Sequence, residues 1–264
     1  MSRIAELFAT RRAQGKKTLI VYLTADYPNP AACRALAAEL AAAGVDLFEI
    51  GLPFSDPMAD GPVIQETSAA ALAAGVTTDS VLRLVDDLRG QLAQPLAVMT
   101  YYNPVLQAGP GSFVDRFAAA GGDALLVPDL PMEECEELDD LCQLQKVDLI
   151  RFLAPTTTPE RMAQICDGAT GFLYCVAHAG VTGNSQTVKN EAPELVAAAR
   201  KMTATPLAIG FGIDGPAAAA TAAAQADAVI IGTAVLAKLK AEGVGGAGRF
   251  VREIRAAMDA ERLL

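Results

Sequence analysis

Two acidic residues occur where acidic residues are costly. Glu49 interrupts an otherwise apolar stretch, Leu47 to Ile50, that is typical of a buried strand. Asp60 follows 11 residues later, in a proline-rich loop from Phe54 to Gly61, so it can fold back over the strand end. Two neighbouring carboxyl groups, one of them buried, favour shifted pKa values and proton-transfer chemistry. The alternative is a core acid satisfied by hydrogen bonds beside a solvated loop.

Glycines gather after three later apolar runs. They occur in Gly180-Val-Thr-Gly183, in Gly210-Phe-Gly212-Ile and in Gly232-Thr233. Glycine lets backbone N–H groups approach an anion closely, and a helix starting near Thr233 adds its dipole. The pattern predicts a phosphate site, although barrels also use such glycines for tight turns.

The sequence offers little support for metal-ion, nucleophilic or Schiff-base catalysis. His178 is the only histidine, so a zinc-type cluster has no second imidazole, and no nucleophile motif surrounds it for a Ser-His-Asp or Cys-His arrangement. No lysine falls in a predicted strand, which disfavours a Schiff-base aldolase, but Lys189 remains a loop candidate. We therefore predict no metal, and acid/base chemistry by carboxylates on a phosphorylated, fairly apolar substrate. Apolar walls for its ring could come from Tyr22, Met99, Leu125, Leu153, Tyr174 and Phe211, which could equally be ordinary barrel packing.

Alternating short apolar runs and longer amphipathic ones must position these residues. Strands are predicted at 18–24, 46–51, 95–101, 124–127, 148–153, 171–176, 206–210 and 228–232. Helices are predicted at 3–14, 30–43, 62–74, 78–92, 111–120, 132–145, 159–167, 191–201, 216–225 and 246–260, and 177–190 is predicted to be a long loop. Eight strands separated by helices predict an α/β fold, a single (β/α)8 TIM barrel with an extra N-terminal helix. A doubly wound open sheet is the alternative, because periodicity cannot distinguish a closed sheet from an open one.

Length and composition agree with one domain over 1–264. A chain of 264 residues fits a barrel of roughly 250 residues, and no composition break suggests a second domain. No apolar run approaches the ~20 residues of a membrane span, and the first residues lack a signal-peptide block, so we expect a cytoplasmic protein. The net charge of −10 argues against nucleic acid as a partner. Five widely spread cysteines fit reduced thiols: Cys33, Cys135, Cys142, Cys166 and Cys175.

The residues from Glu49 to Gln65, EIGLPFSDPMADGPVIQ, resemble almost letter for letter the signature of the tryptophan synthase α-subunit family. The likeness extends from about Leu19 to Ala237. It includes MTYYNP from Met99, DLPMEE from Asp129, APTTTPERM from Ala154, GVTG from Gly180 and GFGI from Gly210.

The resemblance implies a reaction and a role for each matching residue. This family cleaves indole-3-glycerol phosphate to indole and glyceraldehyde 3-phosphate in a retro-aldol step of L-tryptophan biosynthesis. Glu49 would move protons to and from indole C3 and the glycerol hydroxyl, and Asp60 would hold the indole N–H. These roles need a Glu with a raised pKa beside an ionised Asp. Gly183, Gly212, Gly232 and Thr233 would hold the phosphate, and Tyr22, Tyr101, Tyr174 and Phe211 would line the indole pocket.

The resemblance also implies a partner. The loop around Pro53 and Asp56 would meet a β subunit, in an α2β2 heterotetramer through which indole passes by a tunnel. No cofactor is expected in this chain, and PLP is expected in the β partner.

Three departures from the family pattern affect loops. VYLTADYP has Val21, Asp26 and Tyr27 in unexpected places, the segment before Gly180 reads Ala177-His178-Ala179, and Thr233 replaces the more usual Ser. The first two departures put in doubt the geometry of the first loop and the closing of the loop after the sixth strand. They therefore put in doubt the reaction rate and the coupling between subunits more than the type of reaction. We predict that the activity survives.

Two other classes of function stay open at this stage. One is another phosphosugar barrel enzyme, such as an isomerase or epimerase, which would release no indole. The other is a non-catalytic partner that keeps the fold to dock and switch a β subunit, and whose behaviour would not depend on Glu49.

Overall fold

Eight parallel strands close into a barrel in the computed structural model, which describes residues 1–176, 192–210 and 212–260. The strands are β1 (Thr18–Thr24), β2 (Leu47–Gly51), β3 (Leu96–Met99), β4 (Ala124–Leu126), β5 (Asp148–Leu153), β6 (Leu173–Cys175), β7 (Leu207–Ile209) and β8 (Ala228–Ile231). Each pairs with the next, and β8 pairs with β1 from Thr18↔Ala228 onward. The predicted (β/α)8 barrel is therefore confirmed, and the open sheet is excluded.

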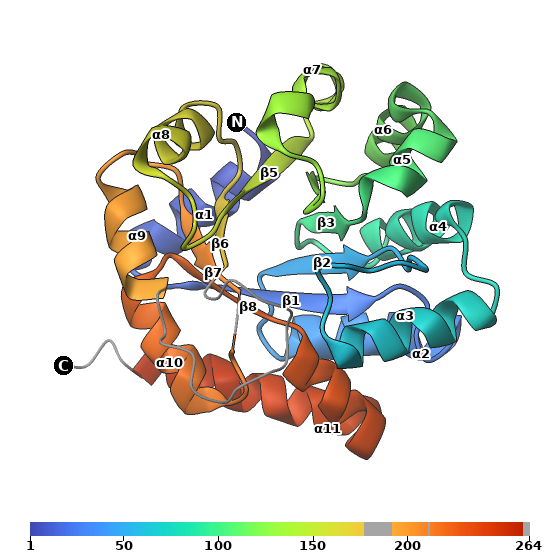
Figure 1. Cartoon of the computed structure of the whole chain (residues 1–264). Coiled ribbons are helices and arrows are strands. Elements are labelled where there is room, and N and C mark those ends of the chain that lie inside the picture. The colour runs from blue at the N-terminus through green and yellow to red at the C-terminus, as the bar shows by residue number, and fades with distance from the viewer. Residues whose placement is uncertain (177–191, 211, 261–264) are drawn as a thin grey trace.

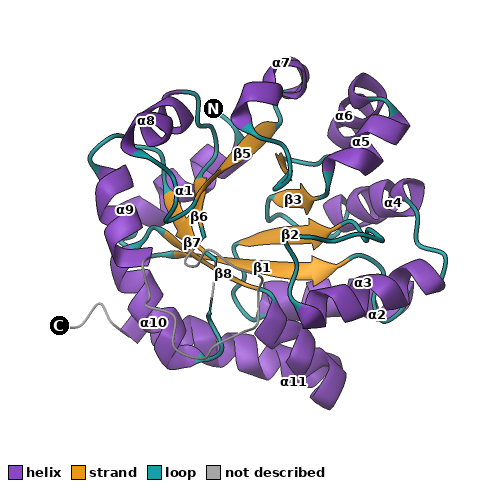
Figure 2. Ribbon diagram, in the orientation of Figure 1, coloured by secondary structure: helices purple, strands orange, loops and turns teal. Residues whose placement is uncertain are grey.

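Helices surround the strands (Figures 1 and 2). They are α1 (Arg3–Ala13), α2 (Pro30–Ala42), α3 (Pro62–Ala73), α4 (Thr78–Arg89), α5 (Tyr102–Ala108), α6 (Pro110–Ala119), α7 (Glu136–Gln145), α8 (Pro159–Asp167), α9 (Ala192–Arg200), α10 (Pro216–Gln225) and α11 (Thr233–Ala260). A short 3₁₀ turn, Met132–Glu134, precedes α7. No single described helix is long and apolar enough to span a membrane; α3 and α4 pass that test only together, bent by 103°.

Local capping signals explain where several helices begin. The side chain of Asn29 accepts a hydrogen bond from the Ala32 amide, and that of Thr158 accepts one from Arg161, each just before a proline at the first helical position. Thr77 and Ser80 form a reciprocal capping box at the start of α4. These helices start where the sequence predicted, within a residue.

Three segments differ from the sequence predictions. Helix α5 was not predicted. The acidic helix predicted at 132–145 is divided into a 3₁₀ turn and α7. The helix expected to start near Thr233 does so, but it and the helix predicted at 246–260 are joined in one element, α11, with a break at Gly243, whose φ is +69°. Pro104 reads as a helix breaker, but it lies in the first turn of α5, where the missing N–H has no intrahelical partner.

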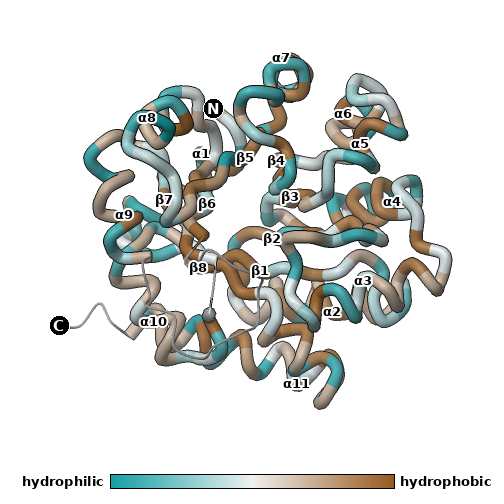
Figure 3. The backbone as a smooth tube through the Cα atoms, viewed as in Figure 1, coloured by the Kyte–Doolittle hydropathy of each residue, from teal (hydrophilic) through white to brown (hydrophobic). Residues whose placement is uncertain are grey.

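Buried hydrophobic side chains form two layers. In Figure 3 the brown colour of hydrophobic residues follows strands such as β1 and β2. Alternate strand residues such as Ile20, Leu47 and Ile230 fill the barrel interior, together with Phe172 just before β6, and the strand residues between them pack outward against the helices. Helix α1 covers the amino-terminal end of the barrel, where Phe8 packs on Phe172 with ring centroids 5.9 Å apart. The opposite, carboxyl-terminal end of the interior is left for polar side chains.

Candidate active site

Glu49 faces the barrel interior near the carboxyl end of β2. It follows the inward-facing Leu47 by two residues, pairs in register with Tyr22 of β1, and is only 2% exposed. Burial raises its pKa from an ordinary 4.5 to about 8, and the negative charge of Asp60 adds to the increase. Its Oε2 has no hydrogen-bond partner among the described residues. Glu49 is therefore a protonated acid at neutral pH with an oxygen available to a ligand.

Other acids at the opposite end of the barrel show what a structural carboxylate is like in this fold. Asp46 accepts a hydrogen bond from the Leu19 amide (2.8 Å) and ion-pairs with Arg255 (3.1 Å). Asp123 similarly accepts from the Leu96 amide, at 2.8 Å. Burial raises the pKa of both carboxyl groups, but hydrogen bonds and arginines oppose the increase. Both causes acting on Glu49 raise its pKa and its Oε2 has no partner among the described residues, which disfavours the interpretation of Glu49 as a core acid satisfied by hydrogen bonds.

Asp60 reaches the same place from the loop that precedes α3. It is 5% exposed, which is more buried than a polar loop suggested from the sequence. Burial raises its pKa to about 6, and a hydrogen bond from Tyr101 opposes that increase. At pH 7 Asp60 is therefore mainly ionised while Glu49 is mainly protonated. The environments of the two carboxyl groups separate their pKa values, as acid/base chemistry requires.

Tyr101 holds the loop that carries Asp60. It follows the end of β3 and is buried, its hydroxyl accepts a hydrogen bond from the Ala59 amide at 2.8 Å, and its ring stacks on Phe54 with centroids 5.2 Å apart. Burial, followed by the charge of Asp60, raises the pKa of Tyr101. Tyr101 thus contacts the carboxylate as well as the loop backbone.

Tyr22 and Tyr174 lie near the two acids, and each hydroxyl occupies the space left by a glycine. A Cβ at Gly51 would overlap the hydroxyl of Tyr22, and a Cβ at Gly210 would overlap that of Tyr174, which donates a hydrogen bond to the Gly210 carbonyl (3.2 Å). Burial is the main cause of the raised pKa of both tyrosines, and the charges of the two acids contribute. The predicted residues of β1, β2, β3 and β6 therefore meet at one end of the barrel.

The apolar walls are partly different from those expected. Leu125 and Leu153 face the helices, because each is one residue out of phase with the inward-facing positions of its strand. Phe152, which sequence reasoning missed, packs on Tyr174 with centroids 5.1 Å apart. An alternation count from Ile150 could have found it. Met99 contacts both the inner and the outer layer, as a partial wall.

Three of the glycine-site residues are in the described part of the chain. Gly212 follows β7, has a φ of +69° and is exposed. Gly232 directly precedes α11, and a Cβ added to Gly232 would lie 3.0 Å from the Cβ of Tyr22. Thr233 is the first residue of α11 and is half-buried. They lie at the carboxyl ends of their strands, like the acids. Gly183 and Phe211, together with His178 and Lys189, lie outside the described residues.

The loop predicted to meet a partner is only partly accessible. Pro53 is buried, whereas Asp56 is exposed and accepts a hydrogen bond from Ser55 at 2.5 Å. Met58, which the sequence did not single out, is 74% exposed. Contacts in this loop could therefore come from Ser55, Asp56 and Met58 more readily than from Pro53.

Within the described ranges, no three His, Cys, Asp or Glu side chains are grouped so that they could hold a metal ion. The five cysteines are free and buried.

Comparisons with known proteins give one consistent result. A family model described as "Tryptophan synthase alpha chain" matches residues 8–260. A relative of that name from Chloroflexus aurantiacus is 44% identical over 98% of this chain and 99% of its own, and one from Synechococcus elongatus is 41% identical over 100% of both. Among solved structures, an aminoacrylate-bound tryptophan synthase from M. tuberculosis superposes with a TM-score of 0.90 at 34% identity, covering 98% of this chain and 100% of that one. An alpha chain from Legionella pneumophila gives 0.91 at 32% identity, covering 100% of both chains.

Proposed function

Because this chain belongs to the tryptophan synthase alpha chain family, and is thus the enzyme subunit that cleaves indole-3-glycerol phosphate in tryptophan biosynthesis, we propose that Glu49 and Asp60 carry out that cleavage. The observation that carries the proposal is the buried pair of acids with separated pKa values, one of which has an oxygen without a partner. We also infer that residues 1–264 form one barrel domain.

Glu49 acts first as an acid and then as a base. Its carboxyl proton is transferred to indole C3, which leaves a cationic ring. The carboxylate so formed takes the proton of the hydroxyl on the carbon bonded to C3; that carbon becomes an aldehyde as the C3–carbon bond breaks, and its electrons neutralise the ring. Protons and electrons balance, and Glu49 is again protonated. A group with a pKa near 8 suits both transfers at neutral pH.

Asp60 stabilises the intermediate charge. Its ionised carboxylate accepts the indole N–H and offsets the positive charge that develops when C3 is protonated. This interaction is stronger in the transition state than in the bound substrate, because the ring is neutral before protonation. The hydrogen bond from Tyr101 supports this role, since it favours the ionised form of Asp60.

The remaining residues bind the substrate. Tyr22, Tyr101, Tyr174 and Phe211 line the indole pocket, to which we add Phe152. Backbone N–H groups of Gly183, Gly212, Gly232 and Thr233 hold the phosphate, with the dipole of α11 behind it. The helix dipole favours the phosphate because Thr233 is the first residue of α11. Gly232, just before it, has no side chain that could occupy the free N–H groups of the first turn.

The partner is a tryptophan synthase β subunit in an α2β2 assembly, docked partly on the loop with Asp56 and the exposed Met58. This chain then carries no cofactor of its own, and PLP resides in the β subunit. We expect the assembly in the cytoplasm, in keeping with five free, buried cysteines.

The test is indole release from indole-3-glycerol phosphate by the purified chain, alone and with its β subunit. Glu49→Gln should lower the rate ~10²–10⁴-fold, because it removes a positioned acid/base group. Glu253→Gln, an exposed glutamate in α11, is the matched control and should keep the parent rate. Undiminished cleavage by Glu49→Gln would show that the acid/base assignment is wrong.

A further inference from the structure

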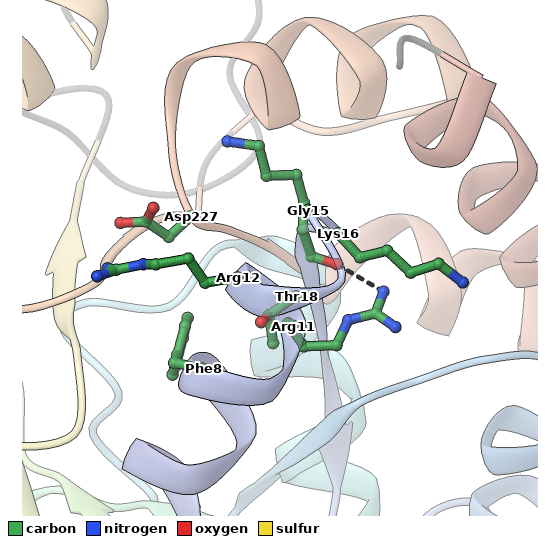
Figure 4. Close-up of a pocket in the computed structure, with 8 residues that line it drawn as sticks. Phe8, Arg11, Arg12, Gly15, Lys16, Thr18 and Asp227 are labelled. Atoms are coloured by element: carbon green, nitrogen blue, oxygen red, sulfur yellow. Dashed lines mark hydrogen bonds between the residues drawn. The ribbon is translucent and has the colours of Figure 1, made fainter. Parts of the chain in front are cut away.

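Cavities lie at both ends of the barrel. The smaller one, about 180 Å³, lies at the amino-terminal end, where Phe8 borders it and Arg11 donates a hydrogen bond to the Lys17 carbonyl at 2.8 Å (Figure 4). The larger one, about 450 Å³, is bordered by the segment after β4 and by residues of β5, so we call it the β4–β5 cavity. Its volume is typical of small-molecule pockets. Of the two, the β4–β5 cavity borders a residue of the proposed indole pocket, Phe152.

The β4–β5 cavity forms where β4 ends earlier than β5. The last pair between the two strands is Leu126↔Ile150, whereas β5 continues to Leu153 and remains paired with β6 to its end. The segment that follows β4 borders the cavity from Val127 onward. Phe152 therefore has β6 on one side and the cavity, in place of a paired strand, on the other side.

Phe152 also faces the interior of the barrel, near its carboxyl-terminal end. It follows the inward-facing Ile150 by two residues, but Ile150 is buried whereas Phe152 keeps part of its surface exposed. Its neighbour on β6, Tyr174, is also only partly buried, and the two rings pack with centroids 5.1 Å apart. The charges of both active-site acids act on Tyr174. Partly exposed, inward-facing rings above a buried layer indicate an open space beside the acids, where the proposed indole pocket lies.

The wall of the β4–β5 cavity is mainly apolar. Side chains of the 3₁₀ turn, β5 and α8 border it, among them Met132, Leu149 and Ile165. The charged side chains at its edge have partners outside the lining: Arg151 ion-pairs with Asp139 at 3.1 Å, Arg161 ion-pairs with Glu133 at 2.6 Å, and Asp129 accepts a hydrogen bond from the Tyr102 amide at 2.9 Å. An apolar group is therefore the kind of group that this cavity favours.

We propose that Phe152 determines which indole rings the site accepts, because it separates the indole pocket from the β4–β5 cavity. This inference rests on the function proposed above and narrows its substrate class. The parent accepts an unsubstituted benzo ring, and a chain with a smaller side chain in place of Phe152 accepts indole-3-glycerol phosphates that carry an apolar group on that ring. Such a group passes the former position of the Phe152 ring and is buried in the cavity. A methyl group buried in this way increases affinity about fourfold.

The experiment measures kcat/KM for the cleavage of indole-3-glycerol phosphate and of its four analogues that carry one methyl group on a benzo-ring carbon. The readout is the ratio of kcat/KM for the methylated substrate to that for the unmethylated one. This ratio is taken within one variant, so it does not depend on the fraction of chain that is folded. In the parent, a methyl group that meets Phe152 should lower the ratio about 10-fold or more. Phe152→Ala should raise that ratio about 10-fold or more, and Phe152→Leu should raise it less.

Two further variants locate the effect. Phe8→Ala is the matched control, because it removes the same side chain beside the smaller cavity, and it should keep the ratio of the parent. Adding Ile165→Phe to Phe152→Ala fills the β4–β5 cavity from α8 and should reverse most of the gain. Equal ratios in the parent and Phe152→Ala at all four ring positions would refute the inference. An equal gain in Phe8→Ala would refute it as well.

A binding measurement separates this inference from the proposed function. The chain contains no tryptophan, so the fluorescence of a bound indole can be followed without a tryptophan background. We expect at least one methylindole to bind more tightly, relative to indole, to Phe152→Ala than to the parent. This shift without any cleavage of indole-3-glycerol phosphate by the parent would contradict the proposed function alone. Cleavage by the parent without this shift would contradict the role of Phe152 alone.

Discussion

Replacing Glu49 by glutamine should change how the stability of the fold depends on pH. The pKa of Glu49 is raised to about 8 in the folded chain, above the ordinary 4.5 of an exposed glutamate. The folded chain therefore keeps a proton that the unfolded chain releases. The stabilising contribution is complete below pH 4.5 and is lost as the pH rises through about 8. Glutamine does not titrate, so Glu49→Gln should remove this dependence.

The size of the effect follows from the shift. Taken to its limit, a displacement from 4.5 to about 8 corresponds to about 5 kcal/mol of unfolding free energy, and the part lost between pH 5 and pH 8 is about 3–4 kcal/mol. The amide of glutamine also lacks a full set of partners at this site, at a cost of about 1–3 kcal/mol. That cost is the same at every pH, so the comparison rests on slopes and not on absolute stabilities.

The assay is urea unfolding of parent and Glu49→Gln at several pH values from 5 to 8. The parent should lose about 3 kcal/mol more than the variant over this interval. Glu253→Gln is the control and should follow the parent. Parallel curves for the parent and Glu49→Gln would refute the conclusion that burial and Asp60 raise the pKa of Glu49.

Three further predictions concern the same site. Initial rates of indole release should be bell-shaped in pH, because the reactive chain needs ionised Asp60, which is lost below about pH 6, and protonated Glu49, which is lost above about pH 8. Gly51→Ala should lower the unfolding free energy by about 1–3 kcal/mol, since its Cβ overlaps the hydroxyl and the ring of Tyr22; adding Tyr22→Ala removes that ring, so the double variant should lose less in urea unfolding than the sum of the two single losses. Tyr101→Phe removes a hydrogen bond that lowers the pKa of Asp60, so the acid limb of the rate profile should move to higher pH.

Each of these predictions has a contrary outcome. A rate that keeps rising above pH 9 would mean that Glu49 is not needed in its protonated form. Additive losses in the double variant at Gly51 and Tyr22 would show that the two groups do not collide. An acid limb left unchanged by Tyr101→Phe would mean that this hydroxyl does not contact Asp60.

Much of the fold could be predicted from sequence because its signals are local. Strand β1 and helices α8 and α10 have the predicted bounds. Each of the two helices starts with a proline that follows a threonine or a glycine, and this local pattern marks the helix start. The unpredicted helix α5 shows the limit of such signals. Pro104 is tolerated because it lies in the first turn of this helix, and that position can be recognised only once the start of the helix is known.

The sequence by itself singled out Glu49 and Asp60 as two acids that can meet at the end of a strand, and it indicated Tyr22 and Tyr174 as possible walls without excluding ordinary barrel packing. Only the tertiary structure decided which of them share a volume. Phe152 faces inward and Leu153 outward because the phase of β5 is set by its pairing with its neighbours. Likewise, the pKa values depend on desolvation and on charges acting through space. These come from residues far apart in the sequence, so no local pattern contains them.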